Sequence, residues 1–588
     1  MAVNNLKSEY DIIFAGGGTA ACVTASRLAK ADPTLSILLI EQGRSNVDDP
    51  AVATPAMFLS HLAPDSKTVL FNKTKKEADL ADRELIVASG GMLGGASSIN
   101  FMMYTRASSI DFDSWKTEGW DGKTLTALAN KAENHQLAGA MINNGAHGHG
   151  GPIQVTYGTH LPKNNYDDLF GAAEVLGIPH TDVQDFQTGH GFERWAKYIS
   201  SDGRRQDTAH CYLHPLMQSG ECPNLHVLTD SLVRRIKFDG IRAVGVEYEP
   251  TATPGGTAPV LISAKKQVVV AAGALNTPLV LERSGVGNGD LLRKHRITVV
   301  SDLPGDSFDE LLTGREDFGK AMAEGSSKMA WNALDVGGKL RPTEEEVTQL
   351  GPVFQECWER DFKHLPSRPL MLVAFFNGYF GDVAELGESS DDHAYYMTAG
   401  TYTAYPYARG SVHIASDDAR APSDFATGYL RHPADLAKQV WAYKKQREIM
   451  RRTDKYAGEV AARHPAFPAG SRAACRDGPA VEGGFGGVEA RAALSPIEYS
   501  KEDDQAIEDW IRSHLETAWH SIGTCKMAPR EQGGVVDENL NVYGTQGLKV
   551  ADLSIAPENV GANTYNTAII VGEKAAQIID QELGLTVE

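Results

Sequence analysis

The sequence lacks the long apolar runs and the basic excess that mark membrane-spanning and nucleic-acid-binding chains. No stretch approaches the roughly 20 consecutive apolar residues that a spanning helix needs, and the first residues, MAVNNLKSEY, contain no apolar signal core. Because 76 acidic residues outnumber 56 basic ones, the net charge of −20 disfavours nucleic acid and anionic membranes as partners. The last residues, LTVE, form no peroxisomal address. These absences predict a cytoplasmic protein.

Cysteine is scarce as well. The six cysteines are scattered without a Cys-x-x-Cys pair, at positions 22, 211, 222, 357, 475 and 525. This spacing argues against both a disulfide framework and a zinc site, and no other metal-ligating group of residues stands out. We therefore expect free thiols and no bound metal. The hydrophobic fraction of 42% is that of an ordinary globular chain, and 588 residues suffice for several domains.

A glycine-rich turn near the N-terminus is the most informative feature that is present. Residues 11–21, DIIFAGGGTAA, place Gly16 and Gly18 after an apolar strand, and a second apolar strand precedes Glu41. The residues between suit a helix, so the segment predicts a βαβ unit. In such a unit the glycines let backbone N–H groups approach a pyrophosphate, and an acid about 20 residues later binds a ribose diol. The pattern predicts a dinucleotide, and the terminal location with Glu41 favours FAD over NAD.

Two other segments suit ligand contacts made by the backbone. The run SGGMLGGASSIN over residues 89–100 is too rich in glycine and serine for a regular element. We expect a cradle whose N–H groups bind phosphate oxygens or the polar edge of a flavin ring. Residues 268–270 predict a buried strand that leads to Gly273 and then to a helix with Thr277 as N-cap and Pro278 as first residue.

The remaining elements extend this α/β pattern. Residues 224–249 alternate in the manner of a hairpin that turns at Asp239-Gly240. Near the C-terminus, a short strand is expected over residues 548–550, and Asp552 follows its end. Ligands of open α/β sheets bind at such strand ends.

Together these segments resemble the glucose–methanol–choline (GMC) oxidoreductases, which are FAD enzymes that oxidise alcohols. The two signatures of that family are visible as GGMLGGASSIN over residues 90–100 and GALNTPLVLERSGVG over residues 273–287. The strings SSINFMMYTRAS, VWAYKK and NVGANTY are similar to those of methanol and short-chain alcohol oxidases of fungi and yeasts. The resemblance spans nearly the whole chain.

The resemblance implies a catalytic pair and a set of cofactor-binding residues. It identifies His520, in the string WHSIGTC, as the base and Asn563 as its partner, which points to a neutral alcohol as substrate. A neutral imidazole accepts the hydroxyl proton while hydride leaves for flavin N5, and the asparagine amide holds the alcohol oxygen. The residues expected at FAD are Gly16, Gly18, Thr19, Ala20, Glu41, Gly94, Gly95, Ser98, Asn100, Val233, Gly273, Asp552 and Thr564.

The resemblance also bears on the substrate. Phe101, Met103 and Trp519 are expected to line a small apolar substrate pocket. Similar oxidases continue after a Leu-Pro-Gly string with a stretch beside the flavin, and this chain lacks that stretch after Gly305. The missing stretch predicts a more exposed cofactor, a wider entrance to the substrate pocket, or inefficient turnover. A larger primary alcohol is therefore an alternative substrate.

The fold class that follows is α/β, or α+β overall. A doubly wound, Rossmann-like FAD-binding domain is expected from residues 1–157, 222–304 and 520–588. Residues 158–221 and 305–519 are expected to form an inserted substrate-binding domain of antiparallel sheet and helices, as in the GMC fold.

Three functions remain open at this point. The favoured one is an FAD-dependent alcohol oxidase that forms an aldehyde and reduces O2 to H2O2. The alternatives are a dehydrogenase that uses another electron acceptor, and a non-redox lyase stabilised by flavin or an impaired homologue. The expected partners are a small alcohol and O2, and a homo-oligomer stays open.

Overall fold

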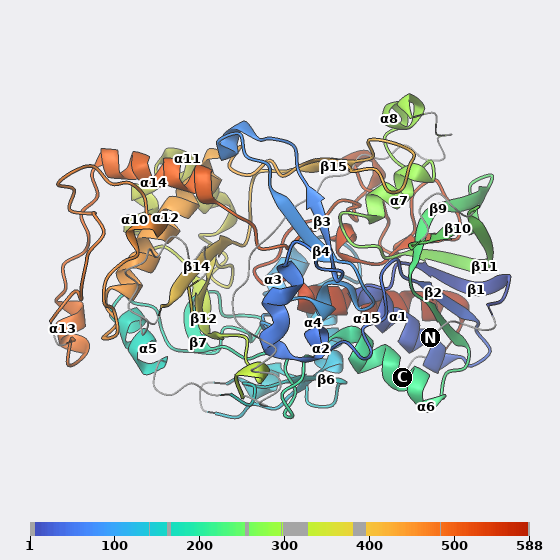
Figure 1. The fold of residues 1–588 in the computed structure, drawn as a ribbon, viewed down its shortest axis with the longest axis horizontal. Coiled ribbons are helices and arrows are strands. Elements are labelled where there is room, and N and C mark those ends of the chain that lie inside the picture. The colour runs from blue at the N-terminus through green and yellow to red at the C-terminus, as the bar shows by residue number, and fades with distance from the viewer. Residues whose placement is uncertain are drawn as a thin grey trace.

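Two sheets organise the chain. The computed structural model describes residues 6–139, 142–160, 166–252, 258–295, 297, 327–379, 396–482 and 484–585. Figure 1 shows a large sheet containing β1 and β11 toward one end of the molecule and a smaller sheet containing β12 and β14 toward the other. The predicted loss after Gly305 lies outside the described residues.

The large sheet combines a parallel part with an antiparallel extension. Within the described residues its order is β8-β2-β1-β11-β10-β9, and β17 also pairs with β11. The pairs that involve β1, β2, β8 and β17 are parallel, whereas β9, β10 and β11 run antiparallel. Its strands are β1 (Glu9–Ala15), β2 (Ile37–Ile40), β8 (Leu225–Leu228), β9 (Ser231–Asp239), β10 (Arg242–Pro250), β11 (Val260–Val270) and β17 (Leu548–Val550).

Continuous apolar strands and close helix packing build the core of this part. All four residues of β2 are buried, which is typical of a parallel strand that is covered on both faces. Helix α1 (Thr19–Ala31) follows β1, and α15 (Tyr565–Leu583) lies beside it (Figure 1). The two helices meet at Gly572, where a Cβ would lie 2.8 Å from the Ala20 carbonyl oxygen.

A buried ion pair joins the same two helices. Arg27 binds the Glu573 carboxylate through Nε at 3.0 Å and Nη2 at 2.7 Å, and Tyr212 donates a hydrogen bond to it at 3.0 Å. The Glu573 side chain is 1% exposed. We expect Arg27→Ala to lower the free energy of unfolding by about 3 kcal/mol, because it leaves a buried carboxylate uncompensated.

Chemical unfolding of Arg27→Ala measures this loss, and Lys30→Ala is the control because Lys30 is exposed at the end of the same helix. A loss for Arg27→Ala no larger than that of the control would contradict the assigned role of the ion pair.

Two local predictions need correction. The hairpin is confirmed only from Ser231 onward, with Arg242 opposite Asp239. Strand β8 instead pairs in parallel with β2, because alternation of apolar residues identifies a strand but not its partner. Helix α7 (Thr277–Arg283) begins one residue earlier than predicted, with Asn276 as its N-cap. The Thr277 hydroxyl donates to Asp552 Oδ2 at 2.6 Å rather than capping the helix.

The smaller sheet is antiparallel throughout, in the order β14-β13-β12-β7. Its strands are β7 (Gly191–Arg194), β12 (Leu334–Leu340), β13 (Met371–Phe376) and β14 (Thr398–Thr403). The helices of this part lie mostly to the left of the sheet in Figure 1. They are α5 (Tyr166–Glu174), α10 (Glu344–Gln349), α11 (Pro352–Asp361), α12 (Pro433–Met450), α13 (Val488–Ala492) and α14 (Lys501–His514). Side chains from the sheet, α11 and α12 share one buried apolar cluster.

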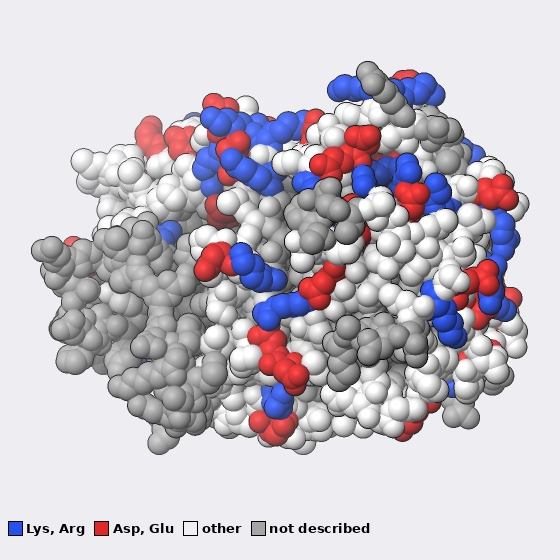
Figure 2. Space-filling model, turned by 45° about the vertical axis from the view of Figure 1, so that its right-hand side comes forward, with Lys and Arg blue, Asp and Glu red and all other residues white. Residues whose placement is uncertain are grey.

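Short elements complete the described structure. Three two-stranded pairs are β3 (Val69–Lys73) with β4 (Ile86–Gly90), β5 (Glu133–His135) with β6 (Ile153–Val155), and β15 (Ser411–His413) with β16 (Asp424–Ala426). The remaining α-helices are α2 (Pro50–Ala53), α3 (Ser109–Asp113), α4 (Gly122–Ala132), α6 (His214–Ser219) and α8 (Gly289–Lys294). Among the described residues, no helix has both the length and the apolar character needed to cross a membrane. Figure 2 shows acidic and basic side chains interspersed on one face.

Candidate active site

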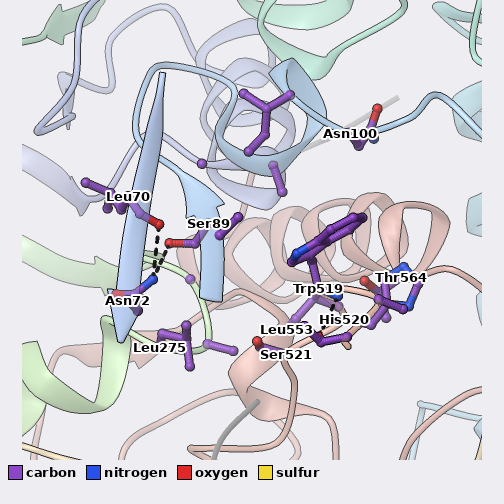
Figure 3. Close-up of a pocket in the computed structure, with 18 of the residues that line it drawn as sticks. Leu70, Asn72, Ser89, Asn100, Leu275, Trp519, His520, Ser521, Leu553 and Thr564 are labelled. Atoms are coloured by element: carbon purple, nitrogen blue, oxygen red, sulfur yellow. Dashed lines mark hydrogen bonds between the residues drawn. The ribbon is translucent and has the colours of Figure 1, made fainter. Parts of the chain in front are cut away.

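A cavity of about 1120 Å³ brings together segments from both sheets. The N-terminal glycine turn, the β3–β4 hairpin, strand β14 and the segments after β11 and β17 all contribute to its wall. Figure 3 shows Leu70, Asn72 and Ser89 of the hairpin on one side of the cavity, with Trp519 and His520 on the other. The side chain of Asn72 ties the hairpin together, since it donates to Leu70 O at 3.3 Å and to Ser89 Oγ at 3.1 Å.

The glycine turn has the properties of an anion site. Gly16 has φ +114°, and a Cβ there would lie 2.4 Å from the Ala271 carbonyl oxygen, so only glycine fits. Gly18 is the N-cap of α1 and provides no side-chain cap, while the first turn of the helix carries no acid. The first N–H groups of a helix have no partner within it, and here they lie at the positive end of the helix dipole beside the cavity.

Glu41 stands at the end of β2 beside this turn. Its carboxylate accepts hydrogen bonds from the backbone N–H of Gly17 at 2.8 Å and of Gly43 at 2.9 Å. Burial raises the pKa of this carboxyl, although the backbone N–H groups oppose the shift. Glu41 therefore anchors the glycine turn and also forms part of the cavity wall.

The predicted backbone cradle packs directly on the glycine turn. Gly95 has φ +57°, and a Cβ there would lie 2.8 Å from Gly18 Cα. Gly94 and Ser98 lie behind the wall: the Ser98 hydroxyl donates to Leu93 O at 2.8 Å and accepts from Asn46 Nδ2 at 2.9 Å. These two residues shape the cradle rather than line the cavity.

Asp552 links the C-terminal strand to the loop after β11. Its Oδ2 accepts hydrogen bonds from Gly273 N at 2.8 Å and from the Thr277 hydroxyl, and its Oδ1 accepts from Ser554 N at 2.8 Å. The carboxylate thus holds two cavity-lining loops together at the carboxyl ends of β11 and β17.

His520 and Asn563 meet inside the cavity although they are 43 residues apart. Asn563 Nδ2 lies 3.1 Å from His520 Nε2, while Asn563 Oδ1 accepts from the Tyr402 hydroxyl at 2.8 Å and from the Thr105 hydroxyl at 3.0 Å. With the amide oxygen placed toward the two hydroxyls, the amide nitrogen faces the imidazole, and a neutral His520 then accepts at Nε2. The proton of the neutral ring then sits on Nδ1.

Burial lowers the pKa of His520 to about 4. The imidazole is therefore neutral at physiological pH, and its Nε2 lone pair can accept a proton when the hydrogen bond from Asn563 is replaced.

Aromatic side chains form the wall beside this pair. Phe101 packs against Phe58 with ring centroids 4.5 Å apart and against Trp519 at 5.1 Å. Trp519 has φ +55°, a costly conformation for a bulky residue, and its Nε1 is buried without a hydrogen-bond partner among the described residues. Met103 also lines the cavity. An indole N–H without a partner beside a cavity is a donor that is available to a bound ligand.

Most predicted site residues share this one cavity. Those that line it are Gly16, Gly18, Thr19, Ala20, Glu41, Gly95, Asn100, Phe101, Met103, Val233, Gly273, Trp519, His520, Asp552, Asn563 and Thr564. Glycine cradles, a helix N-terminus and an unpartnered donor suit a dinucleotide that carries a flavin. Within the described part of the chain, no group of side chains is arranged to hold a metal ion.

Two residues whose hydroxyls contact Asn563 could not be predicted from the sequence. Thr105 is buried in the segment after the cradle, and Tyr402 comes from β14 of the smaller sheet. Neither residue belongs to a spacing pattern, since each hydroxyl reaches Asn563 through tertiary structure alone. The one sequence signal for Thr105 is that it lies within the string SSINFMMYTRAS, which carries part of the family resemblance.

The chain matches known proteins over nearly its whole length. Family models of GMC oxidoreductases match residues 10–298 and 406–572. The chain is 38% identical to an alcohol oxidase of Candida boidinii, with 98% of this chain and 96% of the relative covered. It is 37% identical to alcohol oxidase 1 of Komagataella phaffii, with 99% and 96% covered. Both alignments, of 646 and 649 residues, exceed the 588 residues of this chain, so these relatives carry residues that this chain lacks.

Solved structures confirm the predicted fold class. A variant of formate oxidase from Aspergillus oryzae superposes with a TM-score of 0.78 at 20% identity, covering 98% of this chain and 99% of the other. The match therefore concerns the fold alone.

Proposed function

Because the chain belongs to the GMC oxidoreductase family, we propose that it oxidises a primary alcohol to an aldehyde, with His520 as the base and O2 reduced to H2O2. FAD is the cofactor. The observation that carries the proposal is the pairing of His520 Nε2 with Asn563 Nδ2 at 3.1 Å on the cavity wall.

This pair matches the hydrogen-bonding needs of an alcohol. A substrate hydroxyl that replaces the hydrogen bond between the two nitrogens would donate to His520 Nε2 and accept from Asn563 Nδ2, because the single Nε2 lone pair accepts only one donor at a time. As the hydroxyl proton moves to Nε2, the asparagine amide stabilises the charge that develops on the substrate oxygen. Bound FAD supplies the acceptor for the hydride that leaves the carbon, and O2 then takes the two electrons.

The proposal also gives roles to other residues that line the cavity. Gly16, Gly18 and the first turn of α1 would bind the pyrophosphate, and Glu41 would bind the ribose beside it. The aromatic wall formed by Phe101 and Trp519 keeps water from the substrate carbon and, with Met103, lines the substrate pocket. The predicted domain division, with the larger sheet holding FAD and the smaller sheet facing the substrate, belongs to this proposal.

A spectrum of the purified protein tests the function. The oxidised-flavin band should bleach on anaerobic addition of a primary alcohol and return in air with one H2O2 formed per aldehyde. Bleaching that is reversed only by a dye or a quinone would identify a dehydrogenase. A flavin that no member of an alcohol series bleaches, from methanol to benzyl alcohol, would overturn alcohol oxidation.

The pKa of His520 predicts an acid-tolerant reaction. The base must be neutral, so lowering its pKa from 6.5 to about 4 keeps it competent at more acidic pH. We expect the rate of anaerobic flavin bleaching to be nearly constant from pH 7 down to about pH 5 and to fall near pH 4. A midpoint at or above pH 6.5 would contradict this assignment. The unfolded chain binds this proton more readily, so the same shift weakens the fold as pH falls from 6.5 toward 4.

A further inference from the structure

The amide of Asn563 is held by two hydroxyl groups that come from different parts of the fold. The Tyr402 hydroxyl on β14 donates to Asn563 Oδ1 at 2.8 Å, and the Thr105 hydroxyl donates to the same oxygen at 3.0 Å. Thr105 Oγ1 in turn accepts the backbone N–H of Asn563 at 2.8 Å. One side chain approaches from the smaller sheet and the other from the segment after the cradle.

These contacts favour one of the two amide orientations. If the amide were flipped, Oδ1 would face the lone pair of His520 Nε2, which is an unfavourable pairing. The Tyr402 hydroxyl proton would also lose its acceptor, since this hydroxyl makes no other hydrogen bond among the described residues. A buried donor without an acceptor is unfavourable, so the orientation with Oδ1 toward the two hydroxyls is the stable one.

We infer that Tyr402 and Thr105 are positioning residues that orient the Asn563 amide, so that its NH2 group and the Nε2 lone pair of His520 together present one donor and one acceptor to a substrate oxygen. This inference rests on the proposed function. A substrate hydroxyl, which both donates and accepts, satisfies both groups once it replaces the hydrogen bond between them.

The variant Tyr402→Phe tests this role, because it removes the hydroxyl and keeps the ring. We expect the kcat/KM for alcohol to fall about 10-fold, with retained flavin and unchanged thermal stability. Thr105→Val should act in the same direction, and Thr105→Ser should restore the activity. Tyr407→Phe is the matched control, since the Tyr407 hydroxyl binds Asp361 at 2.6 Å and does not contact Asn563.

A double-mutant cycle separates positioning from a general structural effect. In an Asn563→Ala background the hydroxyl has no amide to orient, so Tyr402→Phe should cause no further loss. If the losses of kcat/KM caused by Tyr402→Phe and by Asn563→Ala multiply in the double variant, the inference is overturned.

A titration of His520 supplies a readout that does not depend on turnover. In the FAD-loaded protein, the carbon-13 NMR signal of the His520 ring, assigned with His520→Gln, reports its pKa. When Tyr402→Phe frees the amide, Oδ1 can face a protonated Nε2, so we expect the pKa to rise by about one unit. An unchanged His520 titration in Tyr402→Phe would overturn the inference, whereas a wild-type flavin that alcohols never bleach would overturn only the proposed function.

Discussion

Replacing His520 with alanine is expected to slow the anaerobic reduction of bound flavin by a primary alcohol about 1000-fold, with FAD still bound. General-base catalysis is typically worth 100-fold to 10,000-fold, and the described residues place no other imidazole against Asn563. The hydroxyl proton then has no acceptor at the point where hydride leaves. Stopped-flow bleaching of the flavin band measures the effect directly, because it isolates the reductive step from the reaction with O2.

Two comparisons make this expectation specific. His364→Ala removes an exposed histidine and should leave the bleaching rate unchanged. Added imidazole should partly restore the rate of His520→Ala, because the truncated side chain leaves room beside Asn563 for an external base. A bleaching rate in His520→Ala within a few-fold of wild type would remove His520 from the role of base.

Local spacing explains why much of this site could be predicted from the sequence. The positions of Gly16, Gly18 and Glu41 follow from one βαβ unit, whose strand and helix lengths leave little freedom. The pairing of His520 with Asn563 came from the family resemblance, and their nitrogens lie 3.1 Å apart. No periodicity or spacing rule relates these two positions.

Other features depend on tertiary register and could not be predicted. Tyr402 reaches Asn563 only because β14 pairs with β13 in the register that sets Tyr402 opposite Leu372. Ser98 lies in the predicted cradle, but its hydroxyl turns inward to Asn46 and Leu93, and composition does not specify which way a loop side chain points. The partner of β8 was predicted wrongly because alternation of apolar residues identifies a strand but not the strand with which it pairs.

Gly95→Val is expected to yield protein that is purified without FAD, or that binds FAD at least 100-fold more weakly. The side chain would enter at φ +57°, and its Cβ would meet Gly18 Cα at 2.8 Å and Thr19 N at 3.3 Å. To relieve these contacts, the cradle must move away from the glycine turn, so the backbone groups of both segments no longer face one ligand. Backbone strain alone costs about 1–3 kcal/mol for a residue in this region of φ.

Gly220→Val separates strain from the loss of the cradle. Gly220 has φ +72°, and apart from its chain neighbours no atom of the described residues lies within 4 Å of the position of its Cβ, so this control suffers similar strain without a clash. We expect Gly220→Val to lose stability yet retain a full complement of FAD, measured as flavin absorbance per protein and by titration of the apoprotein. If Gly95→Val lost no more FAD than Gly220→Val, close packing of cradle and glycine turn would not be what holds the cofactor. If only Gly95→Val lost FAD, the close contact between Gly95 and Gly18 would be what joins the two glycine segments, which are distant in the sequence, into one binding site.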